Sequence, residues 1–479
     1  MLKPVLKKMN DLPLEIETDM TPPSPSPCRR AAPILIAVFG SLLSGCQTLP
    51  SWFAGESPVV SVPEAGRPKI GTIASHRFGL GPGQEMVGTL AAIDAHPSDT
   101  LSDIARHYGL GFNDITIANQ GIKPWTPQPG SRVILPLQFI VPDAPRKDIV
   151  LNLANMRLFY FSKKEPNTLY TYPVGIGRQG WSSPIGATSI VEKQANPVWH
   201  VPPSIQREHA EKGDILPAAV RAGPDNPLGY YAMRLGFPSY LIHGTNKPYG
   251  IGMQISHGCI QLYPEDIETL FGKVAVGAKV RIVHQPYLAA WQQDQLYIEA
   301  HEPLDKWAAG KTRLKKQFLN KLKSLAAEKQ ADVDWERVEQ VIRRSDGIPA
   351  PVLKNSPDLA VLTQQAVQLA HPERLYGQPE IAELKDGDWS MRVATFRTET
   401  EAEQLAAMLN HQGPPIPARK VKLNDQYQVI AGPYKNRKEV NKAAKRVLMD
   451  FELKAEAIEP GQRPDLAVVS SIGSDSPVN

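Results

Sequence analysis

Apolar residues recur at helical spacing directly after Asp99-Thr100. The positions that follow this period are Leu101, Ile104, Ala105 and Tyr108. Thr100 is a typical helix N-cap residue, and Gly109 is typical of a helix C-terminus. The pattern therefore predicts a helix of about two turns that buries one apolar face.

The residues around this helix predict a small βααβ unit over 86–137. A second short helix is expected at 113–119, and Pro129-Gly130 predicts a turn into a strand at 132–136. The first strand, near Glu85–Gly88, has a weak pattern. The alternative is that this segment is a small helical cap on the following domain.

Residues 148–285 have the short apolar runs of β-strands. Such runs are found at 149–153, 157–161 and 170–175, and turn residues separate them. Only 205–212 and 265–272 have helical patterns. An antiparallel β-domain is therefore expected here.

The pattern becomes helical over 286–345. In 311–326 the apolar residues fall at helical spacing and six basic residues occupy the other faces: Lys311, Arg313, Lys315, Lys316, Lys321 and Lys323. A solvated face of a packed helix explains these charges more simply than a surface for membranes or wall polymers.

The last folded unit, 385–459, has the element order βαββαβ. Strands are expected at 389–396, 418–423, 427–432 and 454–458, and helices at 400–410 and 437–451. This is the split ferredoxin-like arrangement, which RNA-binding RRM domains share. The aromatic RNP1 pattern of those domains is absent, so no nucleic-acid partner is expected.

The proline content of the chain indicates linkers between the folded units. The chain has 45 prolines in 479 residues, and they are frequent in 46–85 and 346–384, which we interpret as linkers, with 460–479 as a tail. The formal charge of +4 is too small to indicate a nucleic-acid-binding protein. Overall, a multidomain protein is expected that is β-rich plus α+β.

The three cysteines are Cys28, Cys46 and Cys259, and none forms a CxxC pair. This excludes a disulfide scaffold and a four-cysteine zinc site. Arg29-Arg30 precedes an apolar run over 31–45, which is too short for a comfortable membrane span and typical of a signal peptide.

The run ends in Leu43-Ser44-Gly45-Cys46, which resembles the lipobox of bacterial lipoproteins. The resemblance implies a signal peptide over 1–45, cleavage before Cys46 and a lipid on its thiol. Met20 is an alternative start, and Gln47 favours sorting to the outer membrane. An ordinary secretory signal or a buried N-terminal helix is the alternative.

Cys259 lies in Ser256-His257-Gly258-Cys259, and His243 precedes it by sixteen residues. A thiol nucleophile needs a base and preorganised N–H donors for an oxyanion, for which the amides of Gly258 and Cys259 are candidates. His257 would share a face with Cys259 on a strand, whereas His243 needs the fold to bring it near. Spacing alone does not choose between these bases. A His/His/Cys zinc site and an inert buried cysteine remain as alternatives.

The segment His243–Leu262 resembles the signature of L,D-transpeptidases of the YkuD or ErfK type, and the resemblance extends over about 148–285. Further matching motifs are Val174-Gly175-Ile176-Gly177, Ser183-Pro184-Ile185-Gly186, Asn226-Pro227-Leu228-Gly229 and the run Lys247–Gly252. The resemblance implies a YkuD-type catalytic domain that needs no metal and no organic cofactor.

By position, the resemblance makes Cys259 the nucleophile and His243 the proton acceptor and donor, held by the carbonyl of Gly244. Ser256, His257 and Gly258 would shape the oxyanion site. Thr245 and Gln261 would contact substrate. The family usually has Arg at the position of Gln261, and a neutral amide cannot form the bidentate ion pair of a guanidinium with a carboxylate.

The flanking units resemble two glycan-binding modules. Residues 86–137 resemble a LysM module through Asp99-Thr100-Leu101, Tyr108-Gly109 and Asn119. Residues 385–459 resemble a SPOR domain through 391–396 and 427–434, with Ala394 where that family often has Gly. Both resemblances imply binding to peptidoglycan strands.

Together these features predict a peptidoglycan L,D-transpeptidase. Its acyl group would come from a tetrapeptide stem and pass to an amine of another stem or of an outer-membrane lipoprotein. The alternatives are an L,D-carboxypeptidase and a catalytically inactive peptidoglycan-binding scaffold. The expected location is the periplasm, on a lipid anchor at the outer membrane, with enrichment at the division septum.

Overall fold

The computed structural model describes residues 75–211 and 213–462. The expected signal peptide with Met20, and the expected lipidation site Cys46, lie outside these residues. Within the described ranges, no helix combines the length and the apolar character that crossing a membrane requires.

The first unit contains the two expected helices, α2 (Leu101–Tyr108) and α3 (Phe112–Ala118). Thr100 caps α2 by accepting a hydrogen bond from the Asp103 amide, and Gly109 ends it in the left-handed conformation at φ 70°. Strands β3 (Ala91–Asp94) and β4 (Arg132–Leu135) pair antiparallel.

A strand does form near Glu85–Gly88, as expected, but the strand that pairs with β4 is β3. Residues 86–88 form β2 (Met86–Gly88), which pairs with β5 (Gln138–Ile140). Gly88, at φ 87°, crosses so close to the Leu137 carbonyl that the chain turns there and begins β3 three residues later.

The central unit is built on one nine-stranded sheet. Its strands, in spatial order, are β1 (Arg77–Gly79), β8 (Thr168–Pro173), β7 (Arg157–Phe161), β6 (Ile149–Asn152), β17 (Lys279–Val283), β10 (Gly186–Ala195), β13 (Tyr231–Leu235), β14 (Leu241–His243) and β16 (Ile260–Gln261). The pairs β6–β17 and β14–β16 are parallel and the others are antiparallel. The sheet is thus mixed, and β1 begins inside the segment expected to be a linker over 46–85.

Two helices and two small ladders accompany this sheet. Helices α4 (Pro203–Glu211) and α5 (Pro264–Lys273) match the two predicted helical segments. Strand β9 (Ile176–Gly177) pairs parallel with β15 (Gln254–Ser256), and β11 (Trp199–His200) pairs with β12 (Ala219–Val220). The β9–β15 ladder brings the upstream motif beside the segment that carries Cys259.

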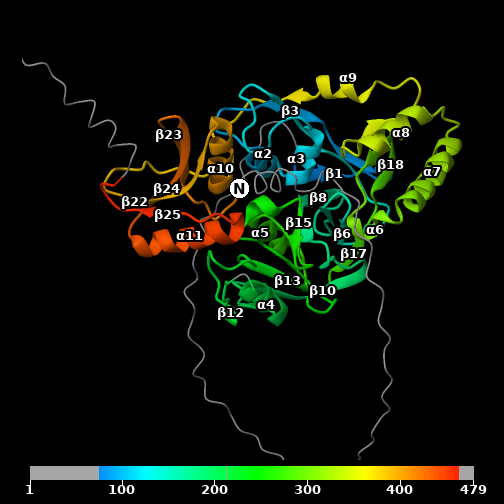
Figure 1. The fold of residues 1–479 in the computed structure, drawn as a ribbon. Helices are drawn as coiled ribbons and strands as arrows, with labels where there is room; N and C mark the ends of the chain where they lie inside the picture. Colours follow the sequence, from blue (N-terminus) through cyan, green and yellow to red (C-terminus); the bar gives the residue numbers. More distant parts are fainter. Residues whose placement is uncertain (1–74, 212, 463–479) are drawn as a thin grey trace, which may run out of the picture. The chain divides into compact units, whose positions relative to one another are not determined.

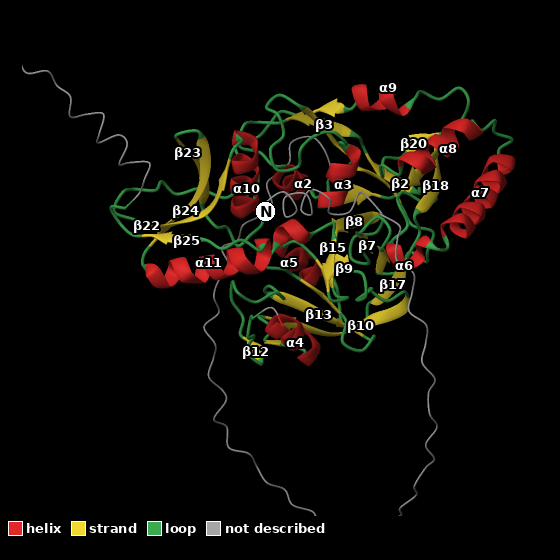
Figure 2. Cartoon of the chain, viewed as in Figure 1, coloured by secondary structure: helices red, strands yellow, loops and turns green. Residues whose placement is uncertain are grey.

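The helical extension begins with a hairpin, contrary to the prediction for 286–345. Strands β18 (Tyr287–Gln292) and β19 (Gln295–Ala300) pair across a two-residue turn, and Gln293 adopts φ 54° there. Helices α6 (Asp305–Ala308), α7 (Lys311–Glu328) and α8 (Trp335–Arg344) follow (Figure 2). The turn of this hairpin, Gln293-Asp294, lacks the Gly or Asn that signals a turn.

Half of the basic residues of α7 form ion pairs within the chain. Lys311 pairs with Glu302, Lys315 with Glu339 and Lys321 with Asp143. This agrees with a solvated face of a packed helix.

Residues 346–384 are folded where a linker was expected. They form β20 (Ala350–Pro351), α9 (Leu359–Gln364) and β21 (Val367–Gln368), and β21 adds to the edge of β3 in parallel. Leu375 is 1% exposed in the core of the first unit. The proline-rich composition did not reveal these tertiary contacts, because each strand is only two residues long.

The C-terminal unit has the predicted βαββαβ order. Strands β22 (Trp389–Phe396), β23 (Ala418–Leu423), β24 (Gln426–Tyr434) and β25 (Glu456–Ile458) form one sheet in the order β23-β24-β22-β25. Helices α10 (Glu399–His411) and α11 (Arg437–Phe451) pack on it (Figure 1).

Candidate active site

His243 is the last residue of β14 and is 3% exposed. Its Nδ1 lies 2.6 Å from the carbonyl oxygen of Gly244. A carbonyl oxygen only accepts, so Nδ1 carries the proton and Nε2 keeps a free lone pair in the neutral ring. Burial lowers the pKa of His243 to about 4, against which hydrogen bonds to the Gly244 and Leu228 backbone act weakly.

Cys259 directly precedes β16, the strand next to β14. Ile242 is paired with Ile260, and His243 with Gln261, in this parallel ladder. Because alternate residues share a face, the side chains of Cys259, Gln261 and His243 are directed to the same side of the sheet. The fold thus places His243 at the end of the strand next to the one that Cys259 precedes, although sixteen residues separate them in sequence.

Cys259 is half-buried, and its thiol is protonated at neutral pH. Burial raises its pKa above the usual range, and a hydrogen bond from the Leu241 backbone only partly opposes this. Sγ lies 3.8 Å from the carbonyl oxygen of Ser239, a distance at which a thiol donates weakly. The resting pair is therefore a neutral thiol and a neutral imidazole.

Two serines fix the backbone immediately before the cysteine. Ser256 Oγ donates to the carbonyl of Cys259 at 2.6 Å and accepts from the amide of Gly258 at 3.1 Å. Ser183 Oγ donates to the carbonyl of Gly258 at 2.8 Å and accepts from the amide of Gly177 at 3.0 Å. The candidate oxyanion donor at Gly258 is thus occupied by Ser256 in this state.

Gly258 has a conformation that favours glycine. Its φ is 103°, and an added Cβ would lie 2.8 Å from the ring of Tyr240. This turn separates β15 from β16, so His257 and Cys259 do not alternate along one strand as expected. Ser183 was not among the predicted site residues, because its motif does not reveal the hydrogen bond to Gly258.

His257 is directed to another set of partners. Its Nε2 lies 2.9 Å from Glu208 Oε2 and 2.9 Å from Arg178 Nη2, and its ring meets Trp181 edge-on at 5.1 Å. The structure therefore places the second candidate base in an ion-paired cluster with α4.

The two expected substrate contacts differ in their surroundings. The hydroxyl of Thr245 is buried and accepts a hydrogen bond from the Lys247 amide at 3.0 Å, so it stabilises the loop after β14. Gln261 exchanges backbone hydrogen bonds with Gly175, and its buried Oε1 has no hydrogen-bond partner among the residues that the structure describes.

A cleft of about 560 Å³ borders the Ser256–Cys259 loop. Gly177, Ser183, Tyr240 and His257 form one wall, and Leu304, Asp305, Lys306 and Trp307, from the segment that contains α6, form another. The helical extension therefore contributes to the cleft. Among residues 75–211 and 213–462, no three His, Cys, Asp or Glu side chains are grouped as metal ligands, so the zinc alternative has no cluster there.

Comparisons with known proteins match three parts of the chain. A LysM domain model matches residues 97–136, an L,D-transpeptidase catalytic domain model matches 146–282, and a SPOR domain model matches 385–450. Their order along the chain is the one expected from the sequence.

Curated relatives and solved structures that match this chain are named L,D-transpeptidases. The probable L,D-transpeptidase ErfK/SrfK of Salmonella typhimurium is 39% identical over 58% of this chain and 91% of its own length. The probable L,D-transpeptidase YcfS of Escherichia coli is 38% identical over 53% of this chain and 81% of its own length. The solved catalytic domain of an E. faecium L,D-transpeptidase aligns over 29% of this chain and 99% of its own, with 19% identity and a TM-score of 0.23. The matched catalytic domain and the long matches to curated relatives show that this chain belongs to the L,D-transpeptidase family.

Proposed function

We propose that the protein is a peptidoglycan L,D-transpeptidase in which Cys259 is the nucleophile and His243 is the general base and acid. The observation that carries this proposal is the pairing of β14 with β16, which brings His243 and Cys259 to one face while Gly244 orients the imidazole. The matched catalytic domain supports the reaction class.

In the first step the thiol proton passes to Nε2 of His243 as Sγ attacks the carbonyl carbon of the third stem residue. A tetrahedral oxyanion forms, stabilised by the amide of Cys259 and, once Ser256 Oγ releases it, by the amide of Gly258. The C–N bond to the terminal D-alanine then breaks, and Nε2 returns the proton to the leaving amine. A thioester between Cys259 and the tripeptide stem remains.

In the second step an amine attacks the thioester. His243 accepts the proton of the attacking amine, an amide bond forms, and the thiol of Cys259 is restored. An amine on the diamino acid of another stem yields a crosslink between two third residues. A lysine of an outer-membrane lipoprotein would instead attach that protein to the wall, and water would release a tripeptide.

The glycan-binding modules support peptidoglycan as the partner. LysM and SPOR domains flank the catalytic domain, so binding to glycan strands would raise the local concentration of stem peptides. We place the enzyme in the periplasm, anchored through a lipid on Cys46 to the outer membrane and enriched at the septum. Loss of palmitate labelling in Cys46→Ala tests the anchor, and uniform envelope fluorescence of a 385–459 fusion would contradict septal enrichment.

The reaction is tested with the soluble chain that starts after residue 46, incubated with tetrapeptide muropeptides, and with Cys259→Ala as the matched control. Crosslinked dimers in the wild type alone support the transferase. Tripeptides alone indicate the carboxypeptidase. No turnover in either protein, with binding to glycan intact, would show that the chain is an inactive scaffold.

A further inference from the structure

The loop between the two reacting residues is hydrogen-bonded to the LysM module. This loop, residues 244–253, joins His243 on β14 to β15, which leads to Cys259. At the start of α3 the amide of Phe112 donates to the carbonyl of Ile251 at 2.8 Å, and the amide of Asn113 donates to the carbonyl of Gly252 at 3.4 Å. On its other side the loop is bonded to the catalytic domain, because the Gly252 amide donates to Val174 at 3.1 Å.

The two backbones meet at a pair of glycines. A Cβ on Gly111 would lie 2.7 Å from Cα of Gly252, and a Cβ on Gly252 would lie 2.5 Å from the nitrogen of Phe112. Real Cβ atoms do not approach backbone so closely, so both positions need glycine for this contact. Gly252 also has a φ of 86°. The loop and the module are therefore in direct backbone contact.

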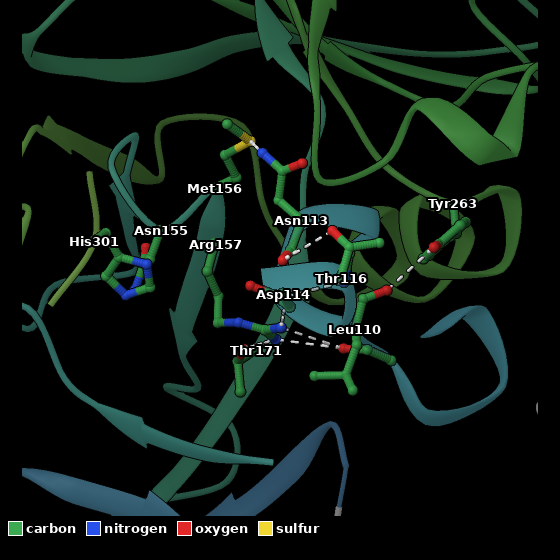
Figure 3. Close-up of polar contacts among 12 residues, drawn as sticks. Leu110, Asn113, Asp114, Thr116, Asn155, Met156, Arg157, Thr171, Tyr263 and His301 are labelled. Atoms are coloured by element: carbon green, nitrogen blue, oxygen red, sulfur yellow. Dashed lines mark hydrogen bonds and ion pairs between the residues drawn. The ribbon is translucent and has the colours of Figure 1, made fainter. Parts of the chain in front are cut away.

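Buried polar contacts hold the same two units together on both sides of the loop. Arg157 on β7 is 1% exposed and bonds Asp114 of α3 at 2.6 Å and Thr171 at 2.9 Å, as Figure 3 shows. Tyr263, two residues after β16, donates to the Leu110 carbonyl at 3.1 Å. A buried guanidinium requires such partners, so separating the units would leave charges unpaired.

A third contact reaches the helix that follows the cysteine. Arg106 of α2 makes two hydrogen bonds to Glu265 at the start of α5, at 3.0 and 2.9 Å. The segment from His243 to α5 is thus bound to the LysM module before Cys259, through Ile251, and after it, through Tyr263 and Glu265.

We propose that the α2–α3 corner of the LysM module is a positioning element of the active site, in which Gly111 and the Phe112 amide hold the 244–253 loop so that His243 and Cys259 stay in register. A loop released from this contact gains conformational freedom, so His243 and Cys259 spend less time in the reactive geometry. This lowers the rate of the chemical step more than it lowers the affinity for substrate. Gly111 and Phe112 contact neither reacting atom. The effect on turnover rests on the proposed function, whereas the effect on the His243–Cys259 pair does not.

Phe112→Pro removes one hydrogen bond of this interface and leaves the helix able to form. Phe112 is the first residue of α3, where proline is well tolerated, and Gly111 has φ −89° and ψ 165°, a conformation that suits the residue before a proline. Phe112→Ala is the matched control, because it removes the same ring and keeps the N–H.

Both variants are measured in the full soluble chain. We expect Phe112→Pro to lower kcat about tenfold or more relative to Phe112→Ala, with KM changed less than twofold. The pH profile of Cys259 alkylation by iodoacetamide is expected to differ from that of wild type in Phe112→Pro only. Equal kcat and equal alkylation profiles in the two variants would overturn the proposal.

A second pair of variants serves if Phe112→Pro does not fold. Gly111→Ala adds a methyl group against Gly252 at an ordinary φ, and Gly272→Ala adds one in α5 where no atom lies within 4 Å. The same losses are expected in Gly111→Ala alone, and their absence would contradict the proposal. If wild type does not turn over muropeptides, the proposed function fails, and the alkylation profiles still decide this inference.

Discussion

Nδ1 of His243 lies 2.6 Å from the carbonyl oxygen of Gly244, the next residue in the chain. This contact between neighbours selects the tautomer with a free Nε2 and fixes the ring plane without a third side chain. A carboxylate in that position would favour the charged imidazolium. The backbone carbonyl favours it less, and burial then keeps His243 neutral.

The two histidines are expected to respond differently to substitution. His243→Ala should lower kcat by about 10²–10⁴-fold, the usual contribution of a general acid–base, with substrate binding retained. His257→Gln should lower kcat less than tenfold, because His257 is bonded to Glu208 and Arg178. Steady-state kinetics on a tetrapeptide substrate separates them, and a larger loss in His257→Gln would reverse the assignment of the base.

The buried His243 makes stability depend on pH. Its folded pKa of about 4 lies below the value near 6.5 in the unfolded chain, so the unfolded state binds more protons between these values. Stability from this residue is complete above pH 6.5 and is lost as the pH falls toward 4, by up to about 3 kcal/mol.

His243→Gln is the comparison for this effect. The difference in unfolding free energy between wild type and variant should shrink as the pH falls from 6.5 to 4. His107 and His284, whose pKa values are also lowered, titrate in both proteins and cancel from the difference. A difference that is constant over this range would show that His243 is not held neutral by burial. Urea titrations at fixed pH provide the measurement.

Ser183→Ala should impair catalysis by loosening the loop before Cys259. The buried hydroxyl connects the amide of Gly177 to the carbonyl of Gly258, and its removal leaves both without a partner at a cost of about 1–3 kcal/mol. We expect a lower kcat and a lower Tm. Ser182→Ala, which alters a neighbouring residue of the cleft wall, is the control. Equal kinetics in the two variants would contradict this role.

Gln261→Arg tests the departure from the usual family residue. Oε1 of Gln261 is buried beside Gly175, without a hydrogen-bond partner in the described part of the chain, on the face that carries Cys259. A guanidinium there would pair with a substrate carboxylate in two hydrogen bonds. The expected result is a lower KM for a tetrapeptide with a free terminal carboxylate and no change for its amide. An unchanged KM for both substrates would show that this position does not contact the carboxylate.

The sequence predicted best those elements whose signals are local. Strands β22 and β23 and helix α11 have the predicted bounds, because apolar periodicity and turn residues mark both ends. The hairpin β18–β19 was missed because its turn, Gln293-Asp294, lacks the usual residues. The folding of 346–384 was missed because β21 exists only through pairing with β3.

The sequence motif named the candidate residues of the site but not their surroundings. The motif around Cys259 and His243 indicated both residues of the proposed reacting pair, whereas spacing left His257 open as the base. What argues against His257 in that role is its contact with Glu208, which lies 49 residues away in sequence. The role of Ser183 and the contact of Phe112 with Ile251 likewise depend on distant segments.

The central claim is that Cys259 forms a thioester with a stem peptide. Mass spectrometry of the intact soluble chain, quenched in acid soon after mixing with a tetrapeptide stem, tests it most directly. We predict an added mass equal to the stem without its terminal D-alanine, located on the peptide that contains Cys259, removed by hydroxylamine and absent in Cys259→Ala. Product formed with no adduct on Cys259, or an equal adduct on Cys259→Ala, would contradict the account.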